Sequence, residues 1–109
     1  MRRVLIIEDD VKISDWLKKY FEKAEYETDL AYDGITGLKK SRDINPDLVI
    51  LDLNLPEMDG MEVCRTIRKE STIPIIMLTA ASDDLDRILG LELGSDDYMG
   101  KPFNPRELL

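Results

Sequence analysis

Short runs of consecutive apolar residues, separated by longer stretches with helical periodicity, constrain the fold of this chain most strongly. Three such runs are Val4–Ile7, Leu48–Leu51 and Ile75–Leu78. Each is rich in branched side chains and apolar at every position, which is typical of a strand buried on both faces of a parallel sheet. Thr28–Tyr32 is more polar and predicts an edge strand, and Tyr98–Met99 predicts a short fifth strand.

Helices are predicted between these strands. The first such segment has apolar residues at the spacing of one helix face, namely Ile13, Trp16, Leu17, Tyr20, Phe21 and Ala24. Asp10 is expected to cap this helix, and Asp33-Gly34 and Asp59-Gly60 mark the starts of two more. The helix after Asp59 carries Val63, Cys64 and Ile67 on one face.

A fourth helix is predicted over Leu85–Glu92, and one turn of a fifth begins at Pro105–Leu109. Strand and helix therefore alternate five times, which predicts an α/β fold with right-handed crossovers and helices on both faces of the sheet. We expect a doubly wound, five-stranded parallel sheet of order 2-1-3-4-5, flavodoxin-like, with its last helix truncated. Residues 1–109 are expected to form a single domain.

Composition and charge exclude several classes of function. The sequence has no histidine, which excludes histidine-based triads and histidine-ligated zinc. Acidic residues outnumber basic ones by 23 to 15, so we expect no direct binding of nucleic acid or anionic lipid by this domain. No run of about 18 apolar residues predicts a membrane span. A single cysteine, Cys64, fits a reducing compartment, and a cytoplasmic location is expected.

Polar residues follow the predicted strands where each one ends. Glu8-Asp9-Asp10 follows the first, Asp52 the third, Thr79 the fourth and Lys101-Pro102 the fifth. Ligands of open parallel sheets bind at this edge, and the order 2-1-3-4-5 makes the first and third strands neighbours. Two carboxylates about 4 Å apart repel by roughly 4 kcal/mol at an effective dielectric constant near 20. Such a cluster needs a cation, protons or a basic partner, and its oxygen ligands suit Mg²⁺.

These residues resemble the receiver domain of two-component response regulators, and the resemblance covers the whole chain. The motifs that carry it are Glu8-Asp9, the segment Asp52-Leu53-Asn54-Leu55-Pro56-Glu57-Met58-Asp59-Gly60, Thr79-Ala80, and Tyr98-Met99-Gly100-Lys101-Pro102-Phe103. The resemblance implies that Asp52 accepts a phosphoryl group from the phosphohistidine of a sensor histidine kinase. It also implies a Mg²⁺ site formed by Asp9, Asp52 and the carbonyl of Asn54, with Glu8 acting through water.

The resemblance also implies how the signal passes on. Thr79 and Lys101 would contact the phosphoryl oxygens, and Thr79 and Tyr98 would move together as a switch. The domain would catalyse only its own phosphorylation and dephosphorylation, so it is not expected to be an enzyme acting on a free substrate.

Two further segments, Leu91–Tyr98 and Asn104–Leu108, are similar to the subclass with a winged-helix DNA-binding output domain. That subclass implies a homodimer, formed on phosphorylation through the fourth helix, fifth strand and fifth helix, with Arg87, Asp97 and Glu107 on the dimer face. Transcription regulation would then act through a C-terminal output domain that we expect to lie outside this sequence.

Three other functions are weighed against this one. A phosphatase working through a phosphoaspartate needs a second aspartate two residues after the nucleophile, and Asn54 stands there. A flavodoxin-like cofactor binder needs a phosphate loop rich in Ser, Thr and Gly where this sequence has Glu8-Asp9-Asp10. An interaction domain without phosphorylation would not need the set Asp9, Asp52, Thr79 and Lys101.

Overall fold

A computed structural model describes residues 2–53, 55, 58–79 and 97–100 of the chain, with Thr79 and residues 97–100 described for the backbone only. Its parallel strands are β1 (Arg3–Ile7), β2 (Glu27–Ala31), β3 (Leu48–Asp52), β4 (Ile75–Thr79) and β5 (Asp97–Gly100). They form one sheet in the order β2-β1-β3-β4-β5, so the predicted strands and their order are confirmed. Strand ends differ from the predicted ones by at most one residue, which is within the usual uncertainty of such boundaries.

Three helices lie within the described residues: α1 (Val11–Lys23), α2 (Gly34–Ile44) and α3 (Gly60–Glu70). Each begins after a capping aspartate, as predicted, and these are Asp10, Asp33 and Asp59. None of these helices is both long enough and apolar enough to cross a membrane. The predicted helices at residues 85–92 and 105–109 lie outside the described residues.

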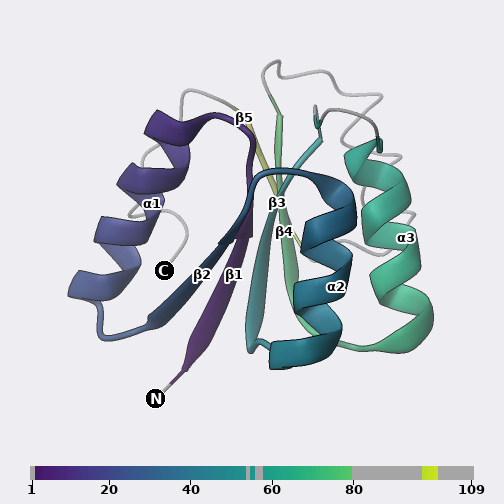
Figure 1. Cartoon of the computed structure of the whole chain (residues 1–109), viewed down its shortest axis with the longest axis horizontal. Coiled ribbons are helices and arrows are strands. Elements are labelled where there is room, and N and C mark those ends of the chain that lie inside the picture. The colour runs from purple at the N-terminus through teal and green to yellow at the C-terminus, as the bar shows by residue number, and fades with distance from the viewer. Residues whose placement is uncertain (1, 54, 56–57, 80–96, 101–109) are drawn as a thin grey trace.

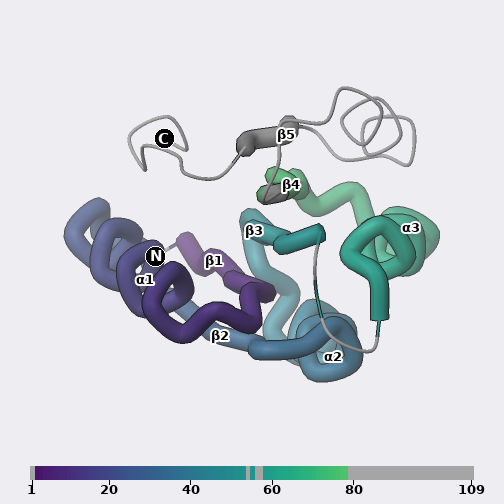
Figure 2. Tube along the Cα trace, turned by 90° about the horizontal axis from the view of Figure 1, so that it is seen from above, coloured from purple at the N-terminus to yellow at the C-terminus, as the bar shows by residue number. Residues whose placement is uncertain are grey.

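The sheet is covered on both faces, which explains its unbroken apolar strands. α1 lies against one face and α2 with α3 against the other, as two perpendicular views show (Figures 1 and 2). Val4 and Ile6 of β1 pack in the cluster that holds Leu17 and Phe21 of α1. The alternate residues of β1, Leu5 and Ile7, instead pack in the cluster under α2 and α3. Successive side chains of a strand point to opposite faces, so both clusters need apolar residues from every central strand.

The predicted buried face of α1 is wrong at Trp16, which is 47% exposed. The buried residues of this helix are Ser14, Leu17 and Phe21, which recur every three or four positions. Trp16 precedes Leu17 directly and is therefore turned by about 100° around the helix axis. The apolar spacing predicted the helix correctly, but it could not show that a serine lies in the buried stripe.

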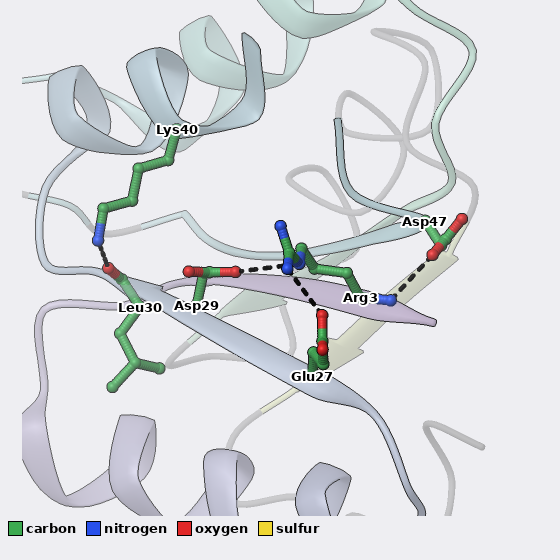
Figure 3. Close-up of polar contacts among 6 residues, drawn as sticks. All are labelled: Arg3, Glu27, Asp29, Leu30, Lys40 and Asp47. Carbon is green, nitrogen blue, oxygen red and sulfur yellow. Dashed lines mark hydrogen bonds and ion pairs between the residues drawn. The ribbon is translucent and has the colours of Figure 1, made fainter. Parts of the chain in front are cut away.

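Polar contacts join β1 to its neighbours at the amino end of the sheet (Figure 3). The backbone N–H of Arg3 donates to Asp47 at 2.8 Å, and its guanidinium donates to Glu27 at 2.7 Å. The bond to Glu27 raises the pKa of Arg3 above its ordinary value. At the outer strand β2, the Lys40 ammonium of α2 donates to the carbonyl of Leu30. This lysine gives a carbonyl of the edge strand a hydrogen-bond donor, and its charge disfavours pairing of the edge with another chain.

The cap of α2 gives a pH-dependent prediction. The Asp33 carboxylate accepts the Thr36 backbone N–H at 2.7 Å and the Thr36 hydroxyl at 3.0 Å. The backbone bond first, and the hydroxyl second, lower the pKa of Asp33. A lowered folded-state pKa stabilises the protein above the unfolded pKa of about 3.9, and this stability is lost as pH falls through the folded pKa.

We therefore expect Asp33→Ala to lower the free energy of unfolding by about 1 kcal/mol at neutral pH. The difference from the unsubstituted protein should shrink as the pH falls below the unfolded pKa of about 3.9, in urea titrations followed by circular dichroism. Asp33→Asn is the matched control, because asparagine caps helices equally well and does not titrate. A difference between Asp33→Ala and the unsubstituted protein that stays constant with pH would contradict this assignment.

Candidate functional site

The ends of β1 and β3 bring the predicted acids together. Ile7 pairs with Leu51, so Glu8, the next residue along, lies beside Asp52 at the end of β3. The Glu8 backbone N–H donates to the Ala31 carbonyl at 2.9 Å, which extends the contact of β1 with β2 by one residue. This is the carboxyl edge of the sheet, at the top of Figure 1 and facing the viewer in Figure 2.

Three carboxylates gather at this edge. Glu8, Asp9 and Asp52 each offer a carboxylate oxygen, and these oxygens all lie within 4.8 Å of one another. Glu8 and Asp52 are buried, with 0% and 1% of their surface exposed, whereas Asp9 is exposed. Consecutive residues of an extended chain point to opposite sides, which accounts for one buried and one exposed carboxylate in this pair.

Asp10, the third acid of the run, is the N-cap residue of α1. Its carboxylate accepts the backbone N–H of Lys12 at 2.9 Å and that of Ile13 at 3.3 Å, which caps α1 as predicted. Its own backbone N–H donates to the Glu8 carboxylate at 3.3 Å. The cap of α1 thus also helps to hold the Glu8 side chain in the cluster.

The electrostatics of this cluster favour a cation. At a separation of 4.8 Å, two carboxylates repel by about 3 kcal/mol at an effective dielectric constant of about 20. Burial of Glu8 and Asp52 adds a desolvation cost for each charge. Carboxylate oxygens that are partly open to water are the ligands that Mg²⁺ accepts, since it keeps several waters and needs few protein groups. The donor set therefore fits a hard divalent cation.

The other predicted site residues are placed only in part. Thr79 ends β4, where its backbone pairs with Gly100 of β5, and its side chain is not described. Asp97 and Tyr98 lie in β5 by their backbone alone. Four more predicted residues lie outside the described part of the chain: Asn54, Arg87, Lys101 and Glu107.

Close packing of Gly60 against the end of β3 is not predicted by the sequence pattern, which indicates only a helix start there. The Gly60 backbone N–H donates to the Leu53 carbonyl at 3.1 Å, directly after Asp52. The one signal in the sequence is glycine itself, a poor helix former, at the first position of a helix.

Comparisons with known proteins agree with this arrangement. A profile of the response regulator receiver domain family matches residues 4–109. The Francisella response regulator 1452 receiver domain is 36% identical, with a TM-score of 0.93 over 99% of this chain and 90% of that one. The BeF3-activated N-terminal receiver domain of Klebsiella pneumoniae RstA is 33% identical, with a TM-score of 0.93 over 98% and 92%. A two-component response regulator from Clostridium difficile is 32% identical, with a TM-score of 0.96 over 99% and 89%.

Proposed function

This chain belongs to the response regulator receiver domain family, and from that premise we propose that it is a phospho-accepting switch of a two-component phosphorelay. Asp52 takes the phosphoryl group from the phosphohistidine of a sensor histidine kinase. The observation that carries this proposal is the cluster of Glu8, Asp9 and Asp52, whose carboxylate oxygens lie within 4.8 Å of one another at the carboxyl edge of the sheet. Residues 1–109 act as one receiver domain in this proposal.

Mg²⁺ is the cation that this site would hold. Asp9 and Asp52 would be direct ligands together with the carbonyl of Asn54, and Glu8 would act through water. When bound, Mg²⁺ would neutralise negative charge on the phosphoryl oxygens. Without the cation, the three carboxylates would repel these oxygens.

The transfer step uses the Asp52 carboxylate as nucleophile. One carboxylate oxygen forms a bond to phosphorus while the bond from phosphorus to the donor histidine nitrogen breaks, and the electron pair leaves with that nitrogen. Lys101 contributes a positive charge and Thr79 a hydroxyl donor to the phosphoryl oxygens. The domain catalyses its own phosphorylation in this way. In its dephosphorylation, water attacks phosphorus, the bond to the Asp52 oxygen breaks, and inorganic phosphate is released.

Phosphorylation changes the charge at Asp52 from one negative charge to roughly two, and adds three strong acceptor oxygens. Thr79 and Tyr98 carry the change to the fourth helix, β5 and the fifth helix, where Arg87, Asp97 and Glu107 contribute to a homodimer. A winged-helix output domain would then bind DNA and regulate transcription in the cytoplasm. A difference of a few kcal/mol between two states is sufficient for such a population shift.

Acetyl phosphate tests the central step without a kinase. We expect incubation with acetyl phosphate and Mg²⁺ to add the mass of one phosphoryl group, measured on the intact protein, with acetate as the leaving group. The adduct should fail to form with EDTA and should be removed by hydroxylamine, which cleaves acyl phosphates. Since the similar RstA domain is a BeF3-activated form, BeF3 with Mg²⁺ should also raise the melting temperature of this chain. Absence of any adduct, while Mg²⁺ still binds, would leave the chain a receiver-shaped interaction domain.

A further inference from the structure

The first residue of α3 touches the backbone that carries Asp52. A Cβ atom on Gly60 would lie 2.6 Å from the Leu53 Cα and would overlap the Asp52 carbonyl oxygen. Real Cβ atoms essentially never come that close to another heavy atom. Gly60 is itself buried, and its N–H donates to the Leu53 carbonyl at 3.1 Å. The start of α3 and the end of β3 are therefore in direct backbone contact.

Space, and not backbone conformation, explains why this residue is glycine. Gly60 lies inside a helix, and its φ is outside the left-handed region that favours glycine. Any residue could adopt this backbone conformation, and most would favour the helix more than glycine does. The neighbouring atoms are backbone atoms of Asp52 and Leu53 and not the ends of flexible side chains, so they cannot rotate away.

Little freedom remains at the end of β3. Asp52 pairs with Leu78 of β4, and the Leu53 N–H donates to the Leu78 carbonyl at 2.8 Å. Any side chain at position 60 must therefore move α3 away or shift the strand end that carries Asp52. A shift of the strand end changes the distance of Asp52 from Glu8 and Asp9.

We infer that Gly60 is a positioning residue for the phosphoryl-accepting site: its contact with the end of β3 holds Asp52 in register with Glu8 and Asp9. This inference rests on the proposed function. Residues that orient a metal-binding side chain without contacting the metal typically change metal affinity by roughly tenfold to a hundredfold when they are altered.

Gly60→Ala and Gly34→Ala form a matched pair for the test. Both glycines are the first residue of a helix and follow a capping aspartate. Both are crowded, but a Cβ on Gly34 would meet only side-chain atoms, of Val63 at 2.8 Å and of Met58 at 3.1 Å. Gly34→Ala therefore controls for the general destabilisation that crowding at a helix start produces.

Isothermal titration calorimetry measures the Mg²⁺ affinity of both variants, at a temperature at which circular dichroism shows them to be folded. We expect Mg²⁺ affinity to fall roughly tenfold to a hundredfold in Gly60→Ala and to fall much less in Gly34→Ala, whose added Cβ would meet side-chain atoms and not the backbone of Asp52. Without any metal, hydrogen exchange of the Leu53 amide should be faster in Gly60→Ala only. Equal Mg²⁺ affinities and equal Leu53 exchange in the two variants would overturn the inference.

A measurement on the unsubstituted protein covers the case in which Gly60→Ala does not fold. Saturating Mg²⁺ should slow amide exchange at Leu53 and Gly60 more than at Thr36, whose N–H is bound at the start of α2. No selective slowing would overturn the inference. If the unsubstituted protein binds Mg²⁺ but forms no adduct with acetyl phosphate, the proposed function fails, and the Mg²⁺ affinities of the variants still decide the role of Gly60.

Discussion

Asp52→Asn is expected to abolish the acetyl phosphate adduct completely. The uncharged amide of asparagine is a poor nucleophile and cannot form the acyl phosphate that the carboxylate forms. Intact-mass measurement with acetyl phosphate and Mg²⁺ gives the result directly. Asp10→Asn is the matched control, since Asp10 is an exposed helix cap beside the cluster and asparagine also caps helices. An undiminished adduct in Asp52→Asn, or its loss in Asp10→Asn, would contradict the assignment of the acceptor.

The same variant offers a second readout that does not involve phosphorylation. The carboxylate oxygens of Glu8, Asp9 and Asp52 lie within 4.8 Å of one another, so removing one of these charges relieves repulsion among them. In EDTA, the free energy of unfolding of Asp52→Asn should rise by about 1–3 kcal/mol. Added Mg²⁺ stabilises the unsubstituted protein by mass action and should stabilise this variant much less. Equal Mg²⁺-dependent shifts in melting temperature for both proteins would place the cation elsewhere.

Phe21→Ala is expected to lower the free energy of unfolding by about 3–5 kcal/mol. Phe21 has no exposed surface and packs between α1 and the sheet. Its ring meets the ring of Tyr20 edge-on at 6.0 Å and that of Tyr26 at 5.4 Å between centroids. Removing it leaves a cavity and two tyrosines without their aromatic partner. Urea unfolding followed by circular dichroism measures the loss.

Trp16→Ala is the informative control for this prediction. Trp16 lies on the same helix and is larger than Phe21, but 47% of its surface is exposed. We expect its removal to cost less than about 1 kcal/mol, because substitutions at exposed positions usually have small effects. If Trp16→Ala were as costly as Phe21→Ala, this would contradict the orientation of α1 in which Phe21 is buried and Trp16 is exposed.

The strands and helix starts could be predicted from the sequence because their signals are local. A run such as Leu48–Leu51 is apolar at every position, so it must be covered on both faces wherever it lies. Asp10 and Asp33 are followed at once by the helices that they cap. Acids at the ends of two strands must meet once those strands are parallel neighbours, and the sheet order brings Glu8 to Asp52.

The remaining features depend on partners that are distant in the sequence, and only the tertiary structure decided them. Trp16 is exposed and Ser14 is buried because packing against the sheet, and not the apolar spacing of the helix, decides which side of α1 is buried. Glu8 is buried and Asp9 exposed because the pairing of β1 with β2 continues through the Glu8 backbone. Gly60 touches Asp52 because α3 returns to the end of β3. Hydrophobic patterns and caps act over a few residues, whereas packing at the site joins segments that are far apart in the sequence and whose spacing no local pattern contains.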